Sequence, residues 1–226
     1  MENKNIYDNF IYDWWKNLDK VIFFLFISLI VLGIFFSLVS TSLIASSKLG
    51  TNNYYFFIRH LIYILIGLTL IIFFSIIPES DIYKLGVIIF FIFFISLLLV
   101  PILGIEIKGS KRWLDIPIIP RFQPIEFLKP FLIIFLSMVI GSRFTSNDYL
   151  KFFLSTLIVL PILFFLVLQP DIGQTLLISC VWLCLIFVSG INLYLFNFLI
   201  LASISLLGYL VIYLPKFSYI KLRIAA

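Results

Sequence analysis

The chain has 226 residues, of which 63% are hydrophobic and 12% are charged, and its mean hydropathy is +1.19. A soluble domain of this length does not tolerate so large an apolar fraction. The composition therefore excludes a soluble protein and indicates an all-α, polytopic transmembrane helical bundle. The formal net charge of +5 favours anionic lipid, or an anionic ligand carried on lipid, as a partner. No segment resembles a nucleic-acid module, so we expect no nucleic-acid partner.

The predicted elements begin with residues 1–19, a polar and aromatic segment. Trp14 and Trp15 in this segment are typical of side chains that settle at the membrane interface. Seven apolar segments follow, each close to the ~20 residues that a span requires. Residues 172–215 carry no charge and are too long for one span, so we divide them at the turn-like Ser189–Asn192. The predicted spans are residues 20–39, 60–77, 84–103, 126–142, 152–168, 172–189 and 194–214.

The loops that follow the first, third, fifth and seventh spans must lie on one side of the membrane. This side, called the motif face below, carries the loop at 104–125, the Gln169–Asp171 turn and Arg59 before the second span. A count of Lys and Arg over all loops favours a cytoplasmic motif face, whereas the charges around the first span favour the opposite. The residues alone therefore leave the orientation open.

Charged residues gather between the third and fourth spans, in the segment from Lys108 to Pro130. Charge beside or inside a membrane is costly unless it serves a purpose. Glu126 and Lys129 are three residues apart on one helix face, where they can pair. One interpretation is an ion pair at the headgroup boundary with a snorkelling lysine; the other is a polar cavity that opens on the motif face. The cavity is favoured by three nearby charged residues, Arg112, Arg121 and Asp171.

Further residues keep both a structural and a functional interpretation. Asp171 opens the sixth span, where it either caps the helix N-terminus or contributes to the same cavity. Arg59 is either an interfacial anchor or a phosphate ligand, since its planar fork suits phosphate oxygens. Trp113 either lies at the interface or shapes a groove for lipid. Cys180 and Cys184 are interpreted as packing residues, because two thiols without His or carboxylate company make a poor metal site.

Three motifs carry a resemblance to a known family, in the family's order and at its span positions. They are G-S-K-R-W at 109–113, R-F-Q-P-I-E-F-L-K-P at 121–130 and Q-P-D-I-G-Q-T at 169–175. Together they resemble the SEDS family (FtsW, RodA and SpoVE) over essentially the whole chain, so residues 20–226 are interpreted as a SEDS-type membrane domain. The second and third motifs are more similar to the FtsW branch of the alphaproteobacterial type than to RodA.

The resemblance implies a peptidoglycan glycosyltransferase that polymerises lipid II at the division septum. It implies a multi-pass protein of the bacterial cytoplasmic (inner) membrane, with a cytoplasmic N-terminal segment and a periplasmic motif face. The implied partners are lipid II, glycan linked to undecaprenyl pyrophosphate, and a class B penicillin-binding protein with other division proteins. Two alternatives stay open: a flippase for lipid-linked precursors, and a non-catalytic membrane scaffold for the division proteins.

The resemblance and the local charges together give eight candidate substrate-binding residues. We expect the basic candidates to hold pyrophosphate, Glu126 to orient Lys129, and Trp113 to line the lipid groove. Ile125 departs from the motif, which usually has Ser, and we expect the missing hydroxyl to weaken the cap of the fourth span. The candidates are Arg59, Lys111, Arg112, Trp113, Gln123, Glu126, Lys129 and Asp171.

No residue is assigned a catalytic role. SEDS proteins usually have ten spans and a catalytic Asp in the loop after the seventh, and none of the acids of this chain matches that Asp. We therefore expect the chain to correspond to the N-terminal seven tenths of such a protein. No metal ligands are assigned, no cofactor is identified, and a requirement for a divalent cation is left open.

Overall fold

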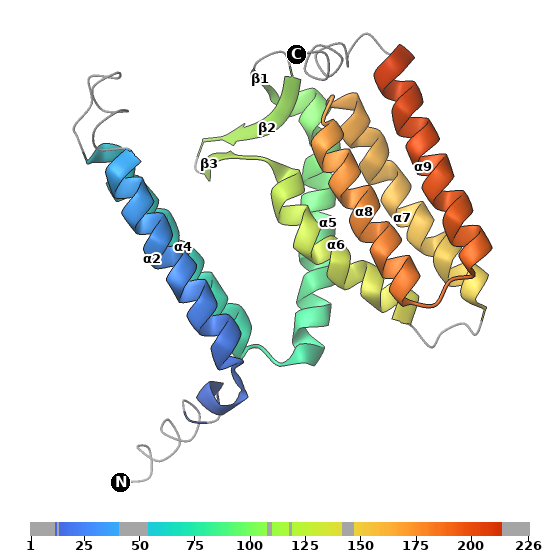
Figure 1. The fold of residues 1–226 in the computed structure, drawn as a ribbon. Helices are drawn as coiled ribbons and strands as arrows, with labels where there is room; N and C mark the ends of the chain where they lie inside the picture. The colour runs from blue at the N-terminus through green and yellow to red at the C-terminus, as the bar shows by residue number, and fades with distance from the viewer. Residues whose placement is uncertain are drawn as a thin grey trace. The chain divides into compact units, whose positions relative to one another are not determined.

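The computed structural model describes residue 12 and residues 14–40, 54–107, 110–117, 119–141 and 147–213. The chain divides into two compact units, Met1–Glu79 and Ser80–Ala226, each of which is considered by itself. The helices, labelled in Figure 1, are α2 (Lys20–Ser40), α4 (Tyr55–Ile76), α5 (Glu79–Leu103), α6 (Pro124–Gly141), α7 (Asp148–Leu168), α8 (Ile172–Val188) and α9 (Leu193–Tyr213).

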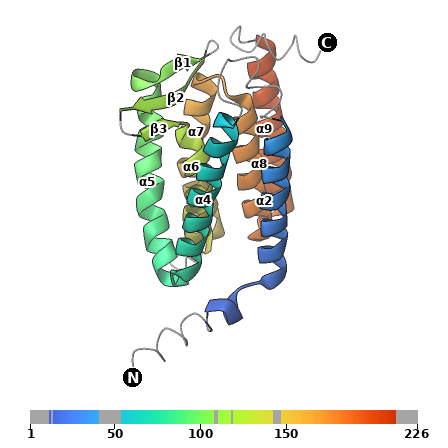
Figure 2. The same cartoon turned by 90° about the vertical axis from the view of Figure 1, so that its left-hand side faces the viewer.

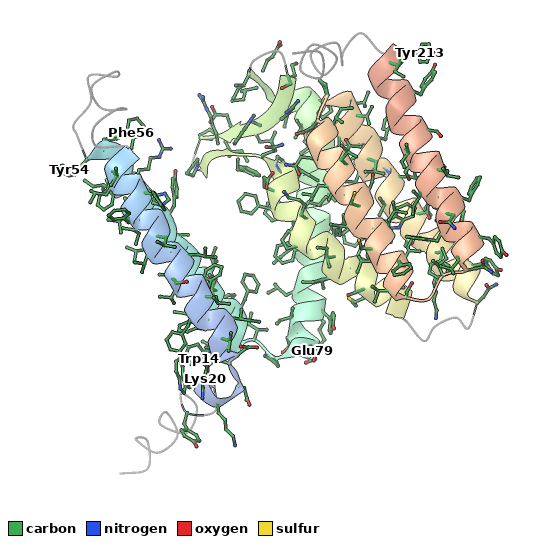
Figure 3. All side chains as sticks on the ribbon, in the orientation of Figure 1. Trp14, Lys20, Tyr54, Phe56, Glu79 and Tyr213 are labelled. Carbon is green, nitrogen blue, oxygen red and sulfur yellow. The ribbon has the colours of Figure 1, made fainter. Side chains whose placement is uncertain are left out.

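The long helices α2 and α4, in the described part of the first unit, lie side by side. Both helices are predominantly apolar, and no residue of their membrane-span windows is buried, as expected of helices that lipid surrounds. Trp14 Nε1 donates a hydrogen bond of 2.9 Å to Ser75 Oγ and so ties the segment before α2 to the end of α4. Figure 3 shows Trp14 and Lys20 at this end of the pair and Tyr54 and Phe56 at the other.

Each predicted span corresponds to one of the seven helices, so the prediction of a polytopic helical bundle is confirmed. Five helices, α2 and α4 to α7, are long and apolar enough to cross a membrane, while α8 is shorter, with 17 residues. Helix α5 begins five residues before the predicted span, because Glu79 and Asp81 are polar yet suit the first turn of a helix. The predicted division before α9 is also confirmed: Gly190 adopts φ +88°, a conformation that favours glycine.

The charged segment before α6, predicted as a loop, contains a small antiparallel sheet. Its strands pair in the order β1-β2-β3, and the register sets Glu106 opposite Lys111 and Leu114 opposite Phe122. Figures 1 and 2 show this sheet at one end of the second unit. Short strands with charged, exposed positions lack the sustained alternation by which a strand is recognised. The strands are β1 (Ile105–Ile107), β2 (Ser110–Ile116) and β3 (Ile119–Phe122).

Helix α6 supplies the core of the second unit through one buried stripe, which packs with buried residues of α7 and α8. The stripe follows the three- and four-residue spacing of a helix face. The expectation about Ile125 is wrong: it is the second residue of α6 and fully buried, so it belongs to the core and does not occupy the cap position. The stripe consists of Ile125, Leu128, Leu132, Leu136 and Ile140.

Candidate functional site

Asp171 lies in the turn between α7 and α8 and caps the first turn of α8. Its Oδ1 accepts the backbone N–H of Gln174 at 3.4 Å, and its Oδ2 accepts the side-chain N–H of Gln123 at 3.0 Å. Only 9% of the side chain is exposed. A buried carboxylate is stable only when hydrogen bonds and opposite charge compensate its lost hydration. Asp171 is therefore both a helix cap and a link to the residue that precedes α6.

Arg112, on β2, binds the same turn. Its Nε donates to the carbonyl oxygen of Gln169 at 3.1 Å, its Nη2 donates to the carbonyl oxygen of Pro170, and its Nη1 lies 3.5 Å from Asp171 Oδ2. Carbonyls at the end of a helix have no partner within the helix. The guanidinium of Arg112 satisfies the carbonyl of Gln169, the C-cap of α7, and that of Pro170 in the turn. It also places a positive charge beside Asp171.

Glu126, Lys129 and Gln174 connect α6 to α8. Lys129 Nζ donates to Glu126 Oε2 at 2.7 Å and to Gln174 Oε1 at 3.2 Å, while Gln174 Nε2 donates to Glu126 Oε1 at 2.6 Å. The predicted pairing of Glu126 with Lys129 is thus confirmed. The lysine side chain is 22% exposed and is held between two helices, which differs from a lysine that snorkels alone to water.

These contacts form a single motif network. The Asp171–Gln174 cap bond joins its two halves, and Glu126 N donates to the carbonyl oxygen of Gln123 at 3.1 Å. Its contacts span up to 58 residues of sequence, and within the second unit they confirm that the charged loop and the turn after the fifth span lie at the same end. The network balances two cations against two carboxylates. Its members are Arg112, Gln123, Glu126, Lys129, Asp171 and Gln174.

Two further candidates lie on β2 beside this network. Lys111 is exposed and stands opposite Glu106 of β1, where it lines a cavity next to Gln169. Trp113 is half-buried and stands opposite Ile105 in the same register. Their proximity to the network follows from their position next to Arg112 on the strand.

Other charged residues fall outside the motif network. Arg121 Nε pairs with Asp115 Oδ2 at 2.7 Å at an exposed position, so this arginine does not contribute to the network as the sequence suggested. Arg59 belongs to the first unit, where its Nε donates to the hydroxyl of Tyr63 at 3.1 Å. Its role at the site stays a prediction. Lys108 lies outside the described residues.

Two glutamines at the site, Gln174 and Gln169, are not among the candidates predicted from the sequence. Gln174 follows Asp171 by three residues, which is the spacing of a capping box, and that pattern could have drawn attention to it. In the structure its side chain reaches α6 instead of the cap residue. Gln169 is 3% exposed, and within the described ranges neither polar atom of its side chain has a hydrogen-bond partner. Nothing in the local sequence predicts that burial.

Over the described part of the chain, no group of three or more His, Cys, Asp or Glu side chains gathers in a way that could hold a metal ion. The motif network itself consists of paired ions and amides. Arg112 and Lys129 supply N–H donors and positive charge, and Asp171 and Glu126 hold those cations in place.

Comparison with known proteins gives consistent matches. The chain is 32% identical to the probable peptidoglycan glycosyltransferase FtsW of Haemophilus influenzae over 188 residues, which cover 79% of this chain and 47% of that protein. It is 36% identical to the protein of the same name from Taylorella equigenitalis over 163 residues, which cover 70% of this chain and 43% of that protein. The chain thus spans about half the length of the curated relatives that it matches.

The fold has solved counterparts. The rod shape determining protein RodA of Thermus thermophilus matches with a TM-score of 0.59 and 25% identity, over 80% of this chain and 59% of that protein. The family model for cell cycle proteins of the FtsW, RodA and SpoVE type matches residues 19–225. The family match extends through both units and through every residue of the motif network. The chain is a multi-pass membrane protein that belongs to the FtsW/RodA/SpoVE family.

Proposed function

We propose that this chain is the substrate-binding part of a peptidoglycan glycosyltransferase that polymerises lipid II at the division septum. The observation that carries the proposal is the motif network, in which three segments distant in sequence bring two cations together at one end of the second unit. The names of the FtsW relatives supply the reaction class. Lipid II carries a diphosphate between its lipid and its sugars, and diphosphate oxygens are suited to Arg and Lys donors.

Arg112 and Lys129 are the proposed diphosphate ligands in the network. Arg112 uses three of its five N–H donors on the turn, and Lys129 uses two of three on Glu126 and Gln174, among the described residues. Each cation therefore keeps at least one donor for a phosphate oxygen while its position is fixed by the protein. Such fixed donors stabilise negative charge as it develops on a leaving diphosphate.

The carboxylates have a positioning role in this proposal. Glu126 accepts from Lys129 and Gln174, and Asp171 accepts from Gln123 and the start of α8. Both groups are engaged as hydrogen-bond acceptors, so we assign neither as the base that deprotonates the attacking sugar hydroxyl. Glu126 orients Lys129.

The remaining candidates have further proposed roles. Lys111 would add positive charge for diphosphate, Gln123 would hold Asp171, and Trp113 would line a groove for the lipid. Arg59, in the first unit, is a separate candidate ligand for diphosphate. We further propose an interfacial, cytoplasmic segment at residues 1–19, followed by a membrane domain at 20–226 in the bacterial inner membrane. The motif face would be periplasmic, with a class B penicillin-binding protein as partner. A solved structure of a peptidoglycan synthase complex contains a chain that matches this one with a TM-score of 0.54, which supports the proposed fold of the membrane domain.

The proposal is tested with Lys129→Ala in lipid nanodiscs. Loss of a hydrogen-bonded cation weakens binding of a charged ligand by about tenfold or more, so the affinity for undecaprenyl pyrophosphate and for lipid II should both fall by that factor. Lys84→Ala is the matched control, because Lys84 is an exposed lysine in an i,i+3 pair with Asp81 on α5. Equal affinities for Lys129→Ala and the unsubstituted protein would return the Glu126–Lys129 pair to a purely structural role.

Activity is measured with the protein expressed from its whole gene, reconstituted with lipid II and the cognate penicillin-binding protein. Glycan strands that disappear with Lys129→Ala, while membrane insertion is unchanged, support the transferase. Translocation of lipid II without strand synthesis would support the flippase instead. Binding of the partner with neither activity would support the scaffold.

A further inference from the structure

Gln169 presents a buried side-chain amide to which the described part of the chain offers no hydrogen-bond partner. The residue follows α7 and caps it through its backbone N–H, which donates to the carbonyl oxygen of Phe165 at 3.1 Å. Its backbone carbonyl is taken by Arg112. The side chain is 3% exposed, and its buried Oε1 and Nε2 have no hydrogen-bond partner among the described residues. Proteins rarely leave both atoms of a buried amide unsatisfied, because the desolvated group destabilises the fold.

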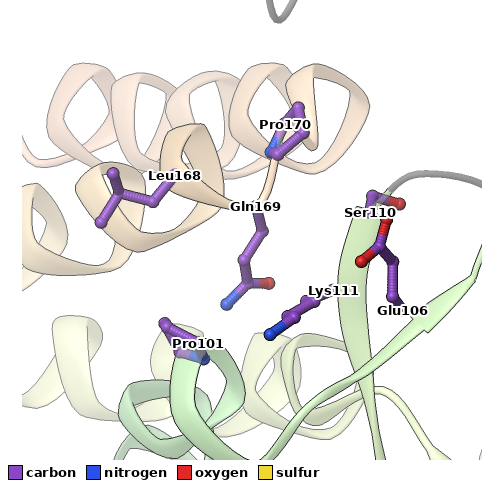
Figure 4. Close-up of a pocket in the computed structure, with 7 residues that line it drawn as sticks. All are labelled: Pro101, Glu106, Ser110, Lys111, Leu168, Gln169 and Pro170. Carbon is purple, nitrogen blue, oxygen red and sulfur yellow. The ribbon is translucent and has the colours of Figure 1, made fainter.

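The side chain of Gln169 points into a cavity of about 370 Å³. Figure 4 shows its amide group directed into the space between Pro101, near the end of α5, and Lys111 on β2. The hairpin register brings Glu106 and Ser110 to the same cavity from β1 and the start of β2. The cavity is thus lined by an amide, an ammonium, a carboxylate and a hydroxyl.

Apolar groups complete the walls. Pro101, Leu168 and Pro170 also line the cavity and offer carbon surface beside the polar groups. Cavities that bind small ligands are commonly 300 to 1,000 Å³, with apolar walls and a few placed polar groups, so this one is of the size for about one sugar ring. It adjoins the motif network, because Gln169 and Pro170 contribute their side chains to the cavity and their carbonyls to Arg112.

We propose that this cavity binds a sugar ring of the lipid-linked substrate, and that Gln169 is a specificity-determining residue for it; this inference rests on the proposed function. A carboxamide offers one acceptor and two donors in a plane, which matches neighbouring groups on a sugar ring that both donate and accept. Glu106 accepts from sugar hydroxyls, and the proline and leucine surfaces contact the C–H face of the ring. The diphosphate of the same molecule then lies toward Arg112 and Lys129.

The proposal is tested with Gln169→Leu, which keeps the approximate size of the side chain and removes its polar atoms. Replacing an unpaired buried amide with an apolar group is neutral or stabilising for the ligand-free protein. The melting temperature should therefore be unchanged or higher. The loss of two hydrogen bonds to a sugar should weaken lipid II binding by about tenfold to thirtyfold. Undecaprenyl pyrophosphate, which has the same lipid and diphosphate but no sugar, should bind with unchanged affinity.

Several results would overturn the inference. Unchanged lipid II affinity in Gln169→Leu would make the amide a structural group, whether or not the melting temperature changes. An equal loss of affinity for both ligands would place Gln169 at the diphosphate and not at the sugar. If the unsubstituted protein bound undecaprenyl pyrophosphate as tightly as lipid II, that result would refute the sugar site and leave the diphosphate site standing. If it bound neither, the proposed function itself would fail, and this inference with it.

Discussion

Substitution of Asp171 distinguishes the two roles of this carboxylate, which accepts hydrogen bonds and places a negative charge beside Arg112. Asp171→Ala removes the cap of α8, the acceptor for Gln123 and the anion beside Arg112. Asp171→Asn keeps one side-chain oxygen for the cap and removes the charge, and Asn caps helices as well as Asp does. Its NH2 group takes the place of Oδ2, and the amide of Gln123, turned by 180°, can accept a hydrogen bond from it. The pair of variants therefore distinguishes hydrogen bonding from charge at one position.

The magnitudes follow from the geometry. A lost cap destabilises by about 1 kcal/mol, and a partly buried amide left without its acceptor adds about 1 kcal/mol. Breaking a fully buried ion pair costs about 3–5 kcal/mol, but Arg112 is 27% exposed, lies 3.5 Å away and keeps two carbonyl acceptors, so about 1 kcal/mol is expected here. Asp171→Ala should lower the free energy of unfolding by about 3 kcal/mol, and Asp171→Asn by about 1 kcal/mol.

The assay is equilibrium unfolding in mixed micelles of a mild detergent and sodium dodecyl sulfate, followed by tryptophan fluorescence. Asp115→Ala is the matched control, since Asp115 is an aspartate of the same region in an exposed pair with Arg121. It should change stability by less than about 0.5 kcal/mol. Equal destabilisation by Asp171→Ala and Asp171→Asn would refute the reasoning, because the charge would then outweigh the cap. So would an Asp171→Ala protein as stable as the control.

Two further predictions concern helix packing and charge balance. A Cβ at Gly86 of α5 would lie 2.9 Å from Ile134 Cγ2, so Gly86→Leu should destabilise the protein by about 1–3 kcal/mol in the same assay. A Cβ at Gly67 would meet no atom of another described segment within 4 Å, so Gly67→Leu should be nearly neutral. Equal destabilisation by the two substitutions would contradict the close approach of α5 and α6. Glu126→Gln removes a carboxylate that competes with diphosphate for Lys129, so affinity for undecaprenyl pyrophosphate should rise by up to about fivefold in a titration. A fall in affinity would mean that the orientation of Lys129 matters more than the competing charge.

Most of the helices could be predicted because the signal for a membrane span is local. Length and apolar composition identify a span without knowledge of its neighbours. Helix starts were predicted less well, as at α5, since polar first-turn residues such as Glu79 are helical yet fail a hydropathy criterion. The sheet at 105–122 was missed because its strands are short, charged and bounded by turns, and only pairing with each other distinguishes them from a loop.

The candidate site was predicted in part. Glu126 and Lys129 pair as their spacing on one helix indicates, since three residues is a near-neighbour distance on a helix face. Arg121, close to the same motif in sequence, pairs instead with Asp115 on the neighbouring strand. The difference is one of range: a helix fixes the direction of its own side chains, whereas a hairpin directs a side chain according to a register that the sequence does not reveal.

The amino-acid sequence by itself determined that this is a multi-pass helical membrane protein with its charges concentrated at a few span boundaries. Apolar length, helical spacing and motif order are properties of contiguous residues, so they do not depend on how the helices pack. Only the tertiary structure decided that Gln123 meets Asp171 across 48 residues and that Gln174 bridges Glu126 and Lys129. It also decided that the amide of Gln169 is buried, with no partner in the part of the chain that the structure describes. Such contacts depend on how α6, α8 and the sheet pack together, and packing is a property of the whole fold.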